Sequence, residues 1–242
     1  MFKYLHHVFK SYSFSQISTY SLHELKRLFR RIFQNSYSLD GEDLIIHSLL
    51  DRKKYGFYVD VGACDPVRLS NTKRFYDIGW RGVNIDANPN SLEVFRRSRP
   101  RDINLNFGIG LNTGHMDFYE LFPKTLGTFS VESRDRNLSL GHKLVSTQKV
   151  SVKTLGAILD SIEDKEVKNI DFLSVDVEGY DFEALSSNNW DKYSPTVVCI
   201  ESPTQFVGVS KNSSNQIVKF LDEKGYDLAY CNGIDLFFKK RK

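Results

Sequence analysis

The stretch from Phe57 to Pro66 constrains the fold most, because an apolar, β-prone run ends there at a carboxylate and a glycine. Phe57 to Val59 lead into Asp60, and Gly62 follows two positions later. This pattern is typical of a buried parallel strand that stops at a ligand. In an open α/β sheet, ligands bind beyond the carboxyl ends of the strands. The sequence therefore predicts an α/β fold with a binding site at this strand end.

The next predicted strand, Val83 to Ile85, also ends in a carboxylate, Asp86. A carboxylate at this place suits the two vicinal hydroxyl groups of a ribose, because each hydroxyl donates a hydrogen bond to an acceptor pair. We therefore expect a nucleoside-containing cofactor held by Asp60, Gly62 and Asp86.

The glycine pattern decides which nucleoside is expected. A dinucleotide site needs three glycines as G-x-G-x-x-G, so that a pyrophosphate can approach the backbone. Here only Gly62 is present, Cys64 and Pro66 stand where close approach would be needed, and a P-loop lysine is missing. S-adenosylmethionine has no phosphate and carries a positive sulfonium, so it suits an acidic strand end with one glycine. The sequence predicts this cofactor.

Strands and helices alternate along most of the chain, which predicts right-handed crossovers and a parallel sheet. The last two strands flank an Asn-Gly hairpin turn, so the sheet should contain one reversed strand. Beyond the first two strands, we expect strands at 103–107, 171–175, 196–200, 226–230 and 234–238, and helices at 41–52, 72–76, 90–98, 154–163 (capped by Thr154) and 214–224.

Residues 109–153 break this alternation. Strand-like segments at 116–119 and 150–152 enclose a polar span at 130–148. A loop of that length inside a compact domain is usually functional or mobile. We predict a substrate-side insertion or lid; the alternative is a disordered connection.

The 242 residues suffice for one large domain, expected at 37–242 and preceded by a basic extension at 1–36. Apolar residues recur at helical spacing over 21–34, which predicts an amphipathic helix. Its apolar face would pack on the domain, our first expectation, or else contact another subunit or lipid. Three scattered cysteines, Cys64, Cys199 and Cys231, predict neither a disulfide framework nor a zinc site.

Charge is unevenly distributed. The net charge of +3 divides into +5 over residues 1–36, +4 over the last four residues and −6 between them. Basic ends suit contact with an anionic membrane, a lipid-phosphate carrier or nucleic acid, or they are solvated tails. No segment reaches the ~18 apolar residues of a membrane span, and the first residues do not form a signal-peptide core. We expect a cytoplasmic protein, with the inner membrane face as a further option; the oligomeric state is left open.

Four segments together resemble the FkbM family of S-adenosylmethionine-dependent methyltransferases, over about residues 38–203. The segments are Val59–Ala63, Ser70–Thr72, Gly79–Asp86 and, most specifically, Ile170–Asp181, with the Asp-Val-Glu-Gly motif. The resemblance implies the Rossmann-like class I methyltransferase fold, an α/β fold with a seven-stranded, mostly parallel sheet and a reversed last strand. It also implies O-methylation, often of sugar hydroxyl groups in glycans, glycolipids or natural products. Cys64-Asp65-Pro66 departs from the family, in which many members have a further polar or glycine pair.

Mapped onto this chain, the resemblance implies roles for single residues. Asp176 and Glu178 would face the methyl group and the acceptor. The cofactor-binding residues would be Asp60 and Gly62 near its methionine and ribose end, Asp86 on the ribose hydroxyls, and Asn106 and Phe107 beside adenine. Ala63 and Asn71 would also bind the cofactor.

A sugar hydroxyl is a poor nucleophile, and a carboxylate that removes its proton contributes roughly 10²–10⁴-fold. We favour Glu178 as this base and Asp176 as an orienting group, with His142 as a second candidate base. No resident metal is predicted, although an alternative has Asp176, Glu178 or Glu201 holding a divalent ion that acidifies the hydroxyl. A purely structural alternative has Asp176 capping the next helix and Glu178 paired with an arginine.

The leading hypothesis is therefore an O-methyltransferase acting on a saccharide or glycoconjugate. A nucleic-acid methyltransferase is the second hypothesis, disfavoured because the Asn/Asp-Pro-Pro-Tyr/Phe element of base amino-methylases is missing after the fourth strand. The third is an inactive methyltransferase-fold module that binds a glycan-assembly partner through 21–34.

Overall fold

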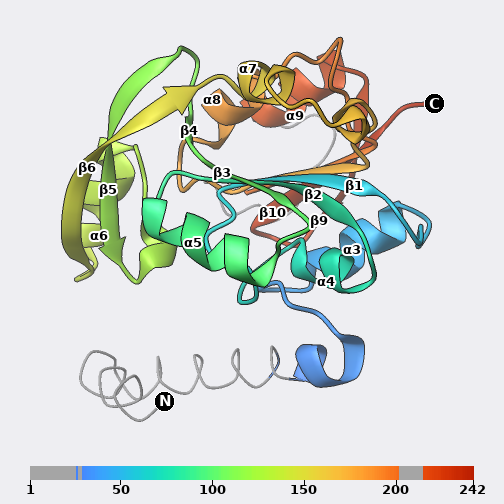
Figure 1. Ribbon diagram of the computed structural model, residues 1–242, viewed down its shortest axis with the longest axis horizontal. Helices are drawn as coiled ribbons and strands as arrows, with labels where there is room; N and C mark the ends of the chain where they lie inside the picture. Colours follow the sequence, from blue (N-terminus) through green and yellow to red (C-terminus); the bar gives the residue numbers. More distant parts are fainter. Residues whose placement is uncertain (1–25, 27–28, 202–214) are drawn as a thin grey trace.

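A seven-stranded sheet forms the centre of the protein, in the order β3-β2-β1-β7-β8-β10-β9. The computed structural model describes residues 26, 29–201 and 215–242 (Figure 1). All neighbouring strands are parallel except β10, which runs antiparallel to both β8 and β9. The predicted parallel sheet with one reversed strand is thus confirmed. The strands are β1 (Phe57–Val61), β2 (Arg81–Asp86), β3 (Ile103–Asn106), β7 (Phe172–Val175), β8 (Val197–Glu201), β9 (Tyr226–Cys231) and β10 (Asp235–Lys240).

Helices cover both faces of this sheet (Figure 1). Polar side chains start several of them: Asn88, Thr154 and Asn215 each accept a hydrogen bond from a backbone N–H of the first turn, as N-caps do. The predicted cap at Thr154 is confirmed. One face carries α3 (Glu42–Leu49), α4 (Lys73–Asp77) and α5 (Pro89–Ser98), and the other carries α7 (Leu155–Asp160), α8 (Asp181–Ser186) and α9 (Gln216–Glu223).

The pleat of β1 divides the core into two layers. Phe57, Val59 and Val61 belong to the large apolar cluster under α7, α8 and α9, whereas Tyr58 packs in the smaller cluster with α3 and α4. Each fully buried side chain of this kind stabilises the fold by about 1.5–3 kcal/mol. The two-residue period of a strand places Asp60 on the Tyr58 side.

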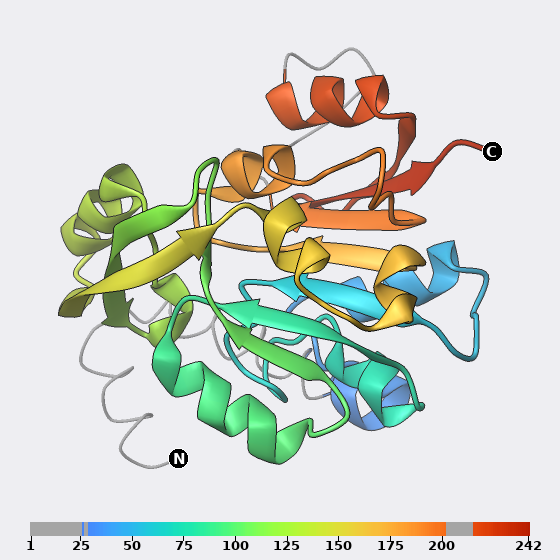
Figure 2. The same ribbon diagram turned by 45° about the horizontal axis from the view of Figure 1, so that its top comes forward.

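The insertion between β3 and α7 forms a second, three-stranded sheet that projects from the first (Figure 2). Its strands are β4 (Gly108–Ile109), β5 (Gly114–Phe122) and β6 (Lys143–Lys153), with a 3-10 turn η2 (Lys124–Leu126) and helix α6 (Val131–Ser139) between β5 and β6. Phe118, Phe129, Val150 and Val152 form its core.

The prediction of a polar loop at 130–148 is therefore wrong. Ser130 caps α6 by accepting from the N–H of Ser133, and β6 begins at Lys143. Pairing of β6 with β5 satisfies the backbone of this polar stretch, so it needs few apolar side chains of its own.

The expected helix over 21–34 falls mainly outside the described residues. Its described end is a π-turn, η1 (Arg30–Gln34). The expected packing onto the domain does not hold there, because Phe29, Ile32 and Phe33 are 55%, 64% and 70% exposed. Another short turn, η3 (Lys165–Lys168), precedes β7. Within the described part of the chain, no helix has both the length and the apolar character that crossing a membrane requires.

Candidate functional site

A cavity of about 310 Å³ opens beyond the carboxyl ends of β1, β2, β7 and β8, where the sequence predicts the site. We call it the strand-end cavity. The insertion supplies part of its wall, as the substrate-side prediction expects. Lining residues include Leu39, Glu42, Gly62, Cys64, Leu69, Asn71, Asp86, Phe107, Lys124, Phe129, Asp176, Glu178, Glu201, Ile234 and Asp235.

Gly62 is the residue that lets two strand ends meet in this cavity. Its φ is +83°, and a Cβ at this position would lie 1.7 Å from the carbonyl oxygen of Asp176. The Gly62 N–H donates to the carbonyl of Ile85 at 2.9 Å. Only glycine fits this left-handed conformation and close approach, so the glycine holds β1, β2 and the segment after β7 together.

Asp86 also lines the cavity, where the sequence predicts a ribose ligand. One carboxylate oxygen accepts from the Cys64 N–H and the other from the Asn88 N–H, both at 2.7 Å. Burial raises the pKa of Asp86, and these two hydrogen bonds lower it again in part. A carboxylate offers about four lone-pair sites, so this fixed group can still accept hydrogen bonds from a ligand.

Asn71 and Phe107 lie at the cavity as well. Asn71 donates from Nδ2 to Ser174 Oγ at 3.1 Å, which fixes its amide beside β7. The Lys153 ammonium lies 4.2 Å from the centre of the Phe107 ring.

The other three predicted cofactor residues are not among those lining the cavity. Ala63 is buried, and Asn106 Nδ2 donates to the carbonyls of Asp86 and Ala87 at 2.8 and 3.0 Å. Asp60 is 5% exposed and accepts from Thr72 Oγ1 at 2.7 Å. The expectation that the Asp60 carboxylate contacts the cofactor is therefore corrected: strand parity turns it away from the cavity and into the α4 side of the sheet.

Arg99 is a residue of the site region that the sequence does not predict. It is fully buried, and its guanidinium donates to the Pro66 carbonyl, Ser70 Oγ and Thr72 Oγ1 at 2.7–2.9 Å. Thr72 links it to Asp60, so a buried network fixes the loop that carries Asn71. In the sequence, Arg99 lies in a basic segment at a helix end, and no local signal distinguishes it from its exposed neighbours.

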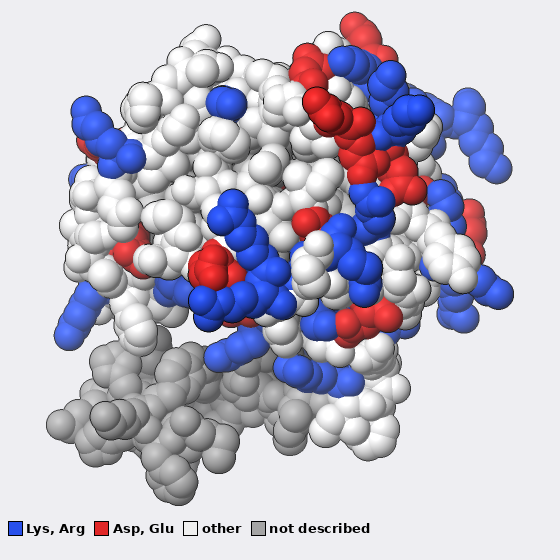
Figure 3. Space-filling view, in the orientation of Figure 1, with Lys and Arg blue, Asp and Glu red and all other residues white. Residues whose placement is uncertain are grey.

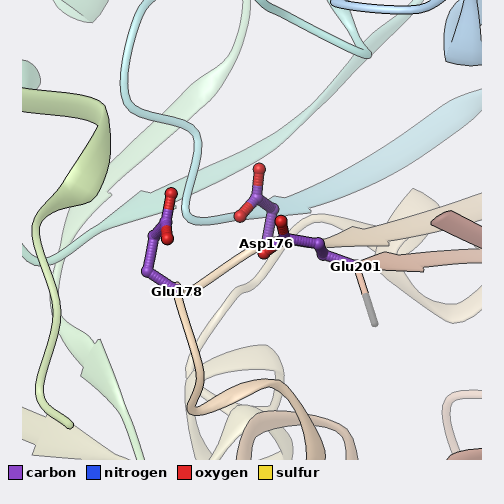
Figure 4. A group of neighbouring side chains, drawn as sticks. All are labelled: Asp176, Glu178 and Glu201. Atoms are coloured by element: carbon purple, nitrogen blue, oxygen red, sulfur yellow. The ribbon is translucent and has the colours of Figure 1, made fainter. Parts of the chain in front are cut away.

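Three carboxylates gather at the ends of β7 and β8 (Figure 4). One oxygen each from Asp176, Glu178 and Glu201 lies within 4.8 Å of the others. The parallel strands β7 and β8 bring these acids to one edge of the sheet. Such oxygens suit a positively charged part of a ligand or a divalent cation of the magnesium class.

The protein around these groups favours their protonated forms. Burial raises the pKa of Glu178 to about 8, with the charge of Asp176 as the next cause. It also raises the pKa of Glu201 to about 8, with Glu178 as the next cause. The Asp176 side chain is exposed toward the cavity, but protein encloses its other sides. This burial raises the pKa of Asp176 well above the ordinary value, and the charge of Glu201 is the next cause. A cation bound here would reverse these shifts.

The structural alternatives for two of these acids do not hold. The described residues give Glu178 no ion pair with an arginine. Asp181, and not Asp176, accepts from the N–H groups of Val177 and Gly179, both at 2.9 Å, ahead of α8. His142, the second candidate base, is not among the lining residues.

Glu178 has an unusual backbone for a non-glycine residue. Its φ is +54°, and Gly179 follows at +92°. A left-handed conformation at such a residue costs on the order of 1–3 kcal/mol and persists only where the surroundings hold it. Here it brings the Glu178 side chain to the strand-end cavity.

Comparison with known proteins finds a methyltransferase family whose model matches most of the chain. The model of a family described as "Methyltransferase FkbM domain" matches residues 60–228. Among solved structures, a precorrin-6y C5,15-methyltransferase from Geobacter metallireducens is 11% identical at a TM-score of 0.45, with 86% of this chain and 92% of that chain covered. A TehB-like SAM-dependent methyltransferase from Corynebacterium glutamicum is 11% identical at a TM-score of 0.39, with 90% and 97% covered. No curated protein matches the chain by sequence.

Proposed function

The chain belongs to the FkbM family of methyltransferases and uses S-adenosylmethionine, and on this premise we propose that it methylates a hydroxyl group of a saccharide or glycoconjugate. Its sheet is that of the Rossmann-like class I methyltransferases. The observation that carries the proposal is the position of Glu178, a carboxylate without an ion-pair partner among the described residues, at the same cavity as Asp86.

The residues present fit the cofactor. Asp86 offers a carboxylate for the ribose hydroxyls, Gly62 lets the ends of β1 and β7 meet at the cavity, and Phe107 offers a ring face for adenine. The sulfonium and amino groups of S-adenosylmethionine are positively charged, and the carboxylates of Asp176 and Glu201 suit both of these charges. When bound, S-adenosylmethionine supplies an electrophilic methyl group.

Glu178 supplies the acid–base chemistry. A hydroxyl oxygen that gains a methyl group must lose its proton, and a base works best with a pKa near the working pH. The Glu178 carboxylate, with its pKa raised to about 8, accepts that proton. Asp176, at the same edge, accepts a hydrogen bond from the acceptor and so orients it.

The lining supports an uncharged, hydroxyl-rich acceptor. Among the described residues that line the cavity, six are acids and one is basic, Lys124, which is paired with Asp65 at 3.1 Å. Carboxylates accept hydrogen bonds from sugar hydroxyls and repel phosphate groups, which disfavours nucleic acid. The exposed side chains of Leu39, Leu69 and Ile234 offer apolar surface for the C–H face of a sugar ring.

The test is methyl transfer from labelled S-adenosylmethionine to a panel of neutral oligosaccharides, uronate-containing glycans and RNA. We expect label in the neutral saccharides, and its loss in Glu178→Gln but not in the exposed control Glu163→Gln. Label in RNA alone would contradict the proposal. Transfer that is abolished by EDTA and restored by Mg²⁺ would favour the alternative in which Asp176, Glu178 and Glu201 hold a metal ion.

A further inference from the structure

A threonine of the insertion reaches the backbone of the candidate base. Thr128 Oγ1 donates a hydrogen bond to the carbonyl oxygen of Glu178 at 2.8 Å. The Thr128 side chain has little freedom, because the residue is 1% exposed and its backbone is paired in both directions with Tyr119 of β5, at 2.9 and 3.1 Å. The second sheet therefore sets the position of the hydroxyl that holds Glu178.

The insertion contacts the next two residues of this turn as well. A Cβ at Gly179 would lie 2.4 Å from Ser133 Oγ in the first turn of α6, so α6 lies close against this glycine. The rings of Phe129 and Tyr180 have centroids 6.2 Å apart. Residues 178–180 are thus contacted one after another by residues 128–133, which come from a different part of the chain.

These contacts matter because the Glu178 backbone is in the left-handed region, at φ +54°. Asp181 holds the turn from its own side, through the N–H groups of Val177 and Gly179. Thr128 holds it from the side of the insertion, through the Glu178 carbonyl. Loss of that hydrogen bond removes one restraint on the left-handed conformation, and relaxation to a negative φ would turn the Glu178 side chain away from its place in the cavity.

We propose that Thr128 is a positioning residue for Glu178, so that the insertion holds the catalytic turn in addition to lining the cavity. The catalytic role of Glu178 rests on the proposed function, whereas the contacts of Thr128 with this turn do not. The Thr128 hydroxyl makes this contact and also accepts from the Ser130 N–H at 2.9 Å. Serine therefore preserves both hydrogen bonds, and valine, which has the same shape, removes both.

The test compares Thr128→Val, Thr128→Ser and the exposed control Thr147→Val. The readout is a pH titration of the Glu178 carboxyl by NMR on protein labelled with ¹³C-glutamate, with the signal assigned from Glu178→Gln. We expect the Glu178 midpoint near pH 8 in the wild type, Thr128→Ser and Thr147→Val, and a shift toward the ordinary glutamate range in Thr128→Val. The affinity for S-adenosylmethionine should stay within about threefold in all of them.

The proposal is overturned if Thr128→Val titrates as the wild type, if Thr128→Ser shifts as far as Thr128→Val, or if both Thr128 variants lose the cofactor. Once an acceptor is identified, Thr128→Val should lower kcat with KM for the cofactor unchanged. Suppose that the Glu178 midpoint shifts in Thr128→Val but not in Thr128→Ser, and that the wild type transfers no methyl group. This result would reject the proposed function and leave the positioning role of Thr128 standing.

Discussion

At the scale of single residues, the proposed methyl transfer depends on the ionisation of Glu178. This carboxylate acts as a base only when deprotonated, and burial raises its pKa to about 8. We therefore expect kcat/KM to rise about tenfold per pH unit below pH 8 and to level off above it, because the pH dependence of kcat/KM reports the pKa values of groups in the free enzyme. Glu178→Gln should lower kcat by about 10²–10⁴-fold. A flat profile between pH 6 and 9 would remove Glu178 from this role.

For some side chains, but not for others, the position relative to the cavity could be predicted from the sequence. Asp86 and Asp176 could be predicted at the cavity because each ends a parallel strand. The position of Asp60 could also have been predicted, since the period of β1 puts it on the same side as Tyr58. Arg99 and Thr128 could not, because their partners lie 27–33 and 50 residues away along the chain, and only the folded structure shows the contacts.

At the scale of elements, Arg99 ties α5 to the loop that carries Asn71. Removing one partner from a buried charged network costs about 3–5 kcal/mol. We expect Arg99→Met to lower the free energy of unfolding by this amount in urea titrations. Arg97→Met is the matched control on the same helix, since Arg97 is largely exposed and should change stability by less than about 0.5 kcal/mol. Equal stability of the two variants would show that the Arg99 network does not hold the loop.

Elements differ in how well the sequence predicts them. The strands of the main sheet could be recognised from apolar runs that end in acids, and the start of α7 from its capping Thr154. Part of the second sheet could not be predicted, because β6 is polar over much of its length. Its strand conformation depends on pairing with β5, a distant segment of the chain. A local pattern cannot show such a pairing.

At the scale of the whole molecule, the acids of the cavity link folding to pH. Glu178 and Glu201, with pKa values of about 8, and Asp235, with a pKa of about 7, bind protons more tightly when folded than when unfolded. Proton binding by these acids therefore stabilises the folded state fully at low pH, and this contribution is lost as the pH rises through 7–8. We expect Tm of the ligand-free protein to fall between pH 6 and 8.5, and Glu201→Gln to flatten that fall. A Tm that rises over this range would contradict the charge pattern described for the cavity.

Basic residues at the C-terminus have partners within the fold. At the C-terminus, Lys239 donates to the Leu49 carbonyl, Lys240 to Ser194 Oγ, and Arg241 pairs with Asp222. On the face shown in Figure 3, Lys and Arg side chains lie among Asp and Glu side chains. Membrane contact through the basic N-terminal extension stays a prediction. Cosedimentation with vesicles containing anionic lipid should exceed that with neutral vesicles, and equal cosedimentation would contradict it.

Cofactor binding at the strand-end cavity is tested most directly by a calorimetric titration with S-adenosylmethionine, which compares the wild type with Asp86→Ala and the exposed control Asp117→Asn. We propose that the Asp86 carboxylate accepts hydrogen bonds from the ribose, so its loss should weaken binding by roughly 10–100-fold, since hydrogen bonds to charged groups contribute about 1.5–3 kcal/mol. Asp117→Asn should bind as the wild type does. No binding to the wild type at high micromolar cofactor, or equal affinity in Asp86→Ala, would contradict the strand-end cavity as the site of methyl transfer.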